Sequence, residues 1–119
     1  MADKIRIPIG TDHTLKFALA VNSEPLDLTE VEEIEVKVYQ KKSNILANFL
    51  LSDNEVEITS FINGQCECFL AKESITNIPT GKLFIQISVD VPNENFDSGF
   101  ERLILTETEI GELVAIAWL

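Results

Sequence analysis

The chain has 119 residues, of which 45% are hydrophobic and 24% are charged, so we expect one globular domain with its own core. Its net charge of -11 disfavours nucleic acid and anionic membranes as partners, because clustered Lys and Arg residues bind both. The charge then indicates either simple solubility or a surface for a basic partner protein.

The N-terminal part of the chain is predicted to form two short strands. Residues 4–9 alternate between apolar and polar, and Pro8 indicates an edge strand because proline donates no backbone hydrogen bond. Residues 13–21 alternate in the same way. Their predicted core-facing side chains are Leu15, Phe17, Leu19 and Val21. Residues 22–25 read as a turn.

Four further segments continue the strand pattern. Residues 33–40 alternate, and their predicted inward side chains are Ile34, Val36 and Val38. Residues 45–51 fit a strand or a short helix, and the polar clusters on both sides favour the strand. Residues 55–60 and 65–71 are predicted to pair as a hairpin. Asn63-Gly64 between them suits a type I′ turn, in which both central residues have positive φ.

The longest predicted strand follows the turn Pro79-Thr80-Gly81. Its apolar face consists of Leu83, Ile85, Ile87, Val89 and Val91. An apolar row of this length requires a packed layer beneath it. Residues 93–99 then form a polar loop, and residues 100–106 form a closing strand.

These segments predict an all-β fold, an antiparallel immunoglobulin-like β-sandwich of about eight short strands spanning residues 1–107. The turns recur at the spacing typical of such sandwiches, and no long helical pattern interrupts them. The chain lacks the Cys…Trp…Cys arrangement of antibody domains.

Residues 108–119 are predicted to form an apolar C-terminal tail, or an extra strand or helix. The run Thr106–Glu109 matches a helix capping box, but the β-branched content of the tail favours a strand or an extended segment. The tail either packs on its own core or docks on a neighbouring subunit. For docking, the predicted partner-binding residues are Val114, Ile116, Trp118 and Leu119.

No group of residues predicts catalysis, a cofactor or a metal. Cys66 and Cys68 share one face of a predicted strand and are expected to be reduced, buried thiols. His13 is the only histidine, and no nucleophile motif accompanies it. Asn93-x-Asn95-x-Asp97 begins like a calcium loop, but Ser98 and Ile104 occupy the positions of its required glycine and carboxylate. The acidic run of residues 30–35 is expected to be a solvated loop and outer strand face.

The order of several short motifs resembles a family of immunoglobulin-like domains in bacteriophage tails and virions, in particular the N-terminal domain of the baseplate upper protein. The motifs are Ile9-Gly10-Thr11-Asp12 before Leu15–Leu19, Glu24–Thr29 before Ile34–Tyr39, Asn63-Gly64, and Ile78–Leu83. The resemblance implies a virion subunit without catalytic residues. This chain differs in being a lone domain with an apolar tail, so a capsid or head-fibre accessory role fits as well.

The expected function is that of a non-enzymatic phage structural subunit, acting through protein–protein assembly. Its partners would be other virion proteins and further copies of itself, first in the host cytoplasm and then in the virion. The alternative is an immunoglobulin-like module that binds a ligand such as carbohydrate. The aromatic residues available for such a site are Tyr39, Phe84, Phe96, Phe100 and Trp118.

Overall fold

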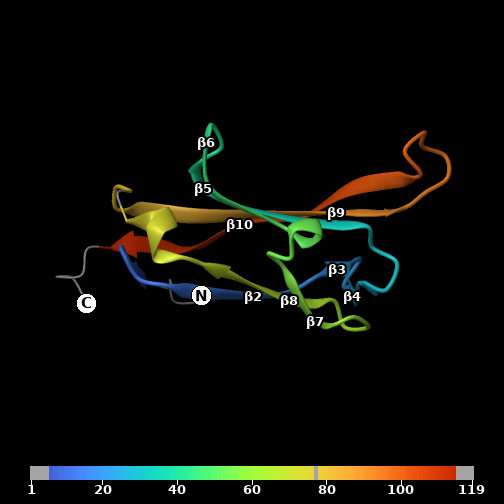
Figure 1. The fold of residues 1–119 in the computed structure, drawn as a ribbon, viewed down its shortest axis with the longest axis horizontal. Coiled ribbons are helices and arrows are strands. Elements are labelled where there is room, and N and C mark those ends of the chain that lie inside the picture. The colour runs from blue at the N-terminus through green and yellow to red at the C-terminus, as the bar shows by residue number, and fades with distance from the viewer. Residues whose placement is uncertain (1–5, 77, 115–119) are drawn as a thin grey trace.

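The computed structural model describes residues 6–76 and 78–114, and Figure 1 shows them as two β-sheets lying one over the other. The larger sheet has the strand order β1–β10–β9–β5–β6. Its strands are β1 (Arg6–Pro8), β10 (Phe100–Val114), β9 (Gly81–Pro92), β5 (Glu33–Lys41) and β6 (Asn44–Leu50). The predicted all-β class is therefore confirmed, and residues 45–50 belong to a strand as favoured.

The smaller sheet has the order β2–β8–β7. Its strands are β2 (His13–Ala18), β8 (Gln65–Leu70) and β7 (Glu57–Ser60). A separate two-stranded ribbon consists of β3 (Ala20–Val21) and β4 (Glu24–Pro25). Two short 3-10 turns, η1 (Leu51–Asp53) and η2 (Lys72–Ile75), complete the elements of the described residues. None of the described helices has the length and apolarity needed to cross a membrane.

The core lies between the two sheets, where the predicted alternation places it. The larger sheet contributes the predicted inward residues of β5 and β9, of which Leu83, Ile34, Val36 and Val38 are fully buried. The smaller sheet contributes Leu15, Cys66, Cys68 and Leu70. Leu28, in the connection before β5, is 1% exposed and seals the core at one end. Apolar burial of this kind is the main favourable term in folding.

β10 differs most from its prediction. The closing strand expected over residues 100–106 continues to Val114, so residues 108–114 extend β10 as a strand. It pairs with β9 along its length, with irregular register around Leu105 and Ile110. The last residues of β10 also pair with β1, and this pairing is parallel. The prediction of a purely antiparallel sheet was therefore wrong for the larger sheet. With ten strands in the described residues, two of them long, the expectation of about eight short strands was also inexact.

The type I′ turn predicted at Asn63-Gly64 is found in the turn between β3 and β4, for which no type was predicted. Asn63 has no positive φ, and the β7–β8 connection spans residues 61–64, so a two-residue type I′ turn at Asn63-Gly64 was wrong. The type I′ geometry occurs between β3 and β4 instead, where Asn22 and Ser23 have φ of 53° and 68°. Asn-Gly marks a turn reliably, but the contacts of the flanking chain decide the type.

Candidate functional site

Three connections gather at one end of the two sheets, at the right in Figure 1. They are residues 19–32, 61–64 and 93–99. Strand pairing places them there, because Ala18 at the end of β2 lies opposite Gln65 at the start of β8. In the larger sheet, Glu33 at the start of β5 lies opposite Asp90 near the end of β9. We call these three connections the loop end.

Backbone hydrogen bonds join two of the three connections of the loop end, residues 19–32 and 61–64. The Leu28 amide donates to the Phe61 carbonyl oxygen at 2.8 Å, and the Leu19 amide donates to that of Gly64 at 2.8 Å. A Cβ atom at Gly64 would lie 2.5 Å from the carbonyl oxygen of Leu19, so only glycine permits this close approach. The β7–β8 turn is therefore fixed against the connection that contains β3 and β4.

The loop end displays large apolar side chains to solvent. Phe61 is 51% exposed, Ile62 is 73% exposed and Phe96 is 49% exposed. Val21 is 37% exposed, so its predicted core position was wrong, because residues 20–25 leave the smaller sheet to form the β3–β4 ribbon. The other exposed large hydrophobic residues among those described, Ile45, Phe69 and Ile104, lie in the strands. Phe61 and Ile62 are neighbours on the β7–β8 turn, and Phe96 lies on the separate β9–β10 loop (Figure 1). Exposed large apolar side chains on an otherwise charged surface are typical of interaction sites.

A groove of about 800 Å³ opens between β2 and β10, and we call it the edge groove. Leu15, Phe17 and Leu19 line one wall, and Leu105, Thr108 and Ile110 belong to the other. His13, the only histidine of the chain, lines the groove at the start of β2. The lining is thus mainly apolar, as in most binding pockets, and offers few groups for proton transfer.

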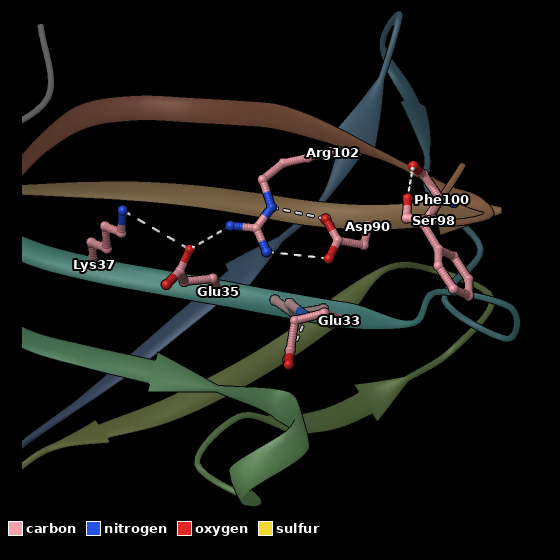
Figure 2. A network of polar contacts seen from close by, with 8 residues as sticks. Glu33, Glu35, Lys37, Asp90, Ser98, Phe100 and Arg102 are labelled. Atoms are coloured by element: carbon pink, nitrogen blue, oxygen red, sulfur yellow. Dashed lines mark hydrogen bonds and ion pairs between the residues drawn. The ribbon is translucent and has the colours of Figure 1, made fainter. Parts of the chain in front are cut away.

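Two acidic residues of β5, Glu33 and Glu35, take part in a structural network on the outer face of the larger sheet (Figure 2). Arg102 donates to both carboxylate oxygens of Asp90, at 2.8 and 3.2 Å, and to Glu35 at 2.9 Å. Glu33 accepts a backbone hydrogen bond from Ser52 at 3.0 Å. These contacts connect β10, β9 and β5 and stabilise their register, since bidentate Arg–carboxylate pairs have a defined geometry. Glu35 is therefore less solvated than its position in an acidic run indicated.

Aromatic residues do not form a single row on one face. Tyr39 and Phe84 stack on the outer face of the larger sheet, with ring centroids 5.8 Å apart. This contact leaves Tyr39 only 5% exposed. Phe96 lies in the β9–β10 loop and Phe100 begins β10, so both lie at the opposite end of β9 from Phe84. The loop that contains Phe96 has hydrogen bonds of its own, because the side chain of Asn93 accepts a hydrogen bond from the Asn95 amide at 3.0 Å.

Among the described residues, no group of three His, Cys, Asp or Glu side chains could hold a metal ion.

Both cysteines are free and buried, as predicted. Burial raises the pKa of the Cys66 thiol to about 11 and that of the Cys68 thiol to about 12. The thiolate is the reactive form, so neither side chain is a nucleophile near neutral pH.

We expect both thiols of the native protein to resist iodoacetamide at pH 8 and to react completely after unfolding in guanidinium chloride. The pKa values lie well above pH 8, and the core excludes the reagent. Mass spectrometry of the intact chain counts the modified thiols. Rapid modification of the native chain would contradict the buried placement.

The predicted partner-binding tail lies only partly within the described residues. Val114 is the last residue of β10 and pairs with Pro8 of β1. Ile116, Trp118 and Leu119 lie outside the described residues. Phe61 and Ile62 were not predicted as surface residues. Two large apolar side chains directly before Asn63-Gly64 are an unusual composition for a turn and could have indicated them.

No protein-family model matches the chain, and the curated proteins contain no match to it. The function of the chain is therefore inferred from the geometry of its own residues and from the resemblance of its short motifs that is described above.

Proposed function

We propose that this chain is an immunoglobulin-like, non-enzymatic structural subunit of a bacteriophage virion that acts through protein–protein assembly. Its partners would be other virion proteins and further copies of itself. It would be made in the host cytoplasm and then carried in the virion. The observation that carries the assembly part of this proposal is the apolar exposure of Val21, Phe61, Ile62 and Phe96 at the loop end. The virion part rests on the resemblance of the sequence motifs alone.

The strand order supports the immunoglobulin-like part of the proposal. In variable-type immunoglobulin domains, one sheet contains strands C′, C, F and G, and the other contains B, E and D. If β2 corresponds to B, then β5 and β6 correspond to C and C′, β7 and β8 to D and E, and β9 and β10 to F and G. The observed orders β10–β9–β5–β6 and β2–β8–β7 follow this scheme.

The same correspondence gives the loop end a role. Binding loops of variable domains cluster at one end of the sandwich and lie between B and C and between F and G. The equivalent connections here contain Val21 and Phe96, and the β7–β8 turn beside them contains Phe61 and Ile62. Apolar side chains on a turn fixed by backbone hydrogen bonds form a preorganised protein-binding surface, which loses little entropy on binding.

The carbohydrate-binding alternative has less support. Stacking against a sugar requires an accessible ring face, and the Tyr39–Phe84 pair leaves Tyr39 only 5% exposed. The exposed Phe96 lies at the far end of the sheet from this pair.

Quantitative mass spectrometry of purified particles of the phage that encodes this chain would test the proposal. We expect the chain to co-purify with the particles in several copies each. Its absence from intact particles would overturn the proposal. In particles complemented with variants, Ile62→Asp should reduce incorporation by roughly tenfold or more, because a charge at an apolar contact is costly. Ile104→Asp is the matched control, since Ile104 is 63% exposed on the outer face of β10.

A further inference from the structure

The edge groove lies between two strand edges that are open over much of their length. β2 pairs only with β8, so its other edge from His13 to Ala18 has no strand partner among the described residues. On the facing side of the groove, β1 covers the edge of β10 only at residues 112–114. The same edge of β10 before residue 112 has no strand partner among the described residues. Thr14, Lys16 and Thr108 are exposed along this opening. Open strand edges beside an apolar groove can pair with an added strand from another segment or chain.

The N-terminal segment of the chain is a poor match for the groove. Ile7 of β1 is 1% exposed and faces the core. Continuing the alternation of β1 toward the N-terminus would direct residues 5 and 3 to the same side. Residue 5 is Ile, but residue 3 is Asp, and burying its carboxylate against an apolar wall would be unfavourable.

The segment Val114–Leu119 has the chemistry that the groove requires. It contains no charged residue, in a chain with a net charge of -11. As a strand it would place Ile116 and Trp118 on one face and the two small residues Ala115 and Ala117 on the other. Its six residues and the six residues of β2 both span about 20 Å when extended.

Chain direction favours a second copy as the source of this segment. Within one chain, the groove residues of β10, such as Leu105 and Thr108, precede Val114 along the strand. The residues after Val114 would therefore need to reverse direction to enter the groove of their own chain. A reversal uses about two residues as a turn, which removes Ala115 and Ile116 from the pairing. A second copy supplies the segment from residue 115 onward without a turn, while its Val114 stays paired with Pro8 of its own β1.

We propose that the edge groove binds the apolar segment Val114–Leu119 of a second copy of this chain as an added strand along β2. The inference rests on the proposed assembly function and specifies one contact of that assembly. Backbone hydrogen bonds to the edge of β2 hold the segment, and the large side chains Ile116 and Trp118 fill the space above Phe17 and Ile110.

Sedimentation equilibrium of the full chain and three full-length variants would test this contact. Thr108→Arg places a charged, bulky side chain in the groove at an exposed position, and Trp118→Ala removes the largest side chain of the segment. Both should weaken self-association by roughly 30-fold or more, as loss of a central aromatic contact does. Thr59→Arg is the matched control, because Thr59 is an exposed residue of β7 outside the groove. It should associate like the unmodified chain.

Mixing the two weakened variants makes the test specific. Thr108→Arg retains an intact segment and Trp118→Ala retains an intact groove, so an equimolar mixture should form a one-to-one complex that neither variant forms alone. A mixture that stays monomeric would overturn the proposal, as would self-association that survives both variants. A monomeric full chain would overturn it too, while assembly with other proteins would still be judged by the particle experiment. Far-ultraviolet circular dichroism of each variant excludes unfolding as the cause of lost association.

Discussion

Gly64→Ala is expected to lower the free energy of unfolding by about 3 kcal/mol. Gly64 has φ of +66°, a left-handed conformation that costs other residues about 1–2 kcal/mol. The added Cβ would also lie 2.5 Å from the carbonyl oxygen of Leu19 and 2.8 Å from that of Leu26, and both are backbone atoms that cannot rotate away. Urea denaturation followed by circular dichroism measures the loss.

Gly99→Ala is the matched control for this substitution. Gly99 also has positive φ, at 82°, but nothing lies within 4 Å of its missing Cβ. Its alanine variant should lose only the conformational part, about 1 kcal/mol. Equal losses at the two positions would show that the close approach of the β7–β8 turn to residues 19–26 contributes nothing. Because that turn carries Phe61 and Ile62, Gly64→Ala should also weaken incorporation into particles.

Leu83→Ala is expected to cost about 3 kcal/mol of stability, because it leaves a cavity in the core. Leu83 is 0% exposed and belongs to β9, which pairs with both β10 and β5. Structure around a central strand relaxes little, so most of the cavity should remain. Chemical denaturation with a linear extrapolation to zero denaturant gives the value.

Ile104→Ala is the control for Leu83→Ala. It measures how much stability is lost when a strand residue loses its large side chain without leaving a cavity. Ile104 is 63% exposed in β10, so its truncation should change stability by less than about 0.5 kcal/mol. A large loss at Ile104, or a negligible one at Leu83, would contradict the placement of the core between the sheets. The comparison also tests which face of the larger sheet is buried.

The net charge and the open strand edges of this molecule have opposite effects on self-association. Unpaired edges promote association with other strands, and the edge groove combines such edges with an apolar floor. A net charge of -11 makes copies of the chain repel one another, which protects the soluble state. An uncharged segment such as Val114–Leu119 can approach the groove with the least local repulsion.

Much of the fold could be predicted from local patterns. Alternation in residues 33–40 and 83–91 identified β5 and β9 and the faces that they bury, and these faces are buried as expected. Alternation failed at Val21, where the strand pattern continues but the chain turns away at Asn22 and Ser23. Of the candidate sites, the docking tail was predicted from its composition, whereas the loop end and the edge groove were not.

The sequence by itself determined that the chain is all-β, where most strands begin and end, and which side chains face the core. These properties depend on residues one or two positions apart, so they are written in the local order of apolar and polar side chains. Only the tertiary structure decided the parallel pairing of β1 with β10, the gathering of Phe61, Ile62 and Phe96 at one end, and the opening between β2 and β10. Each of these features brings together residues that are far apart in the chain. The ion pair of Arg102 and Glu35, which are 67 residues apart, is a further example. No local pattern specifies which distant strands become neighbours.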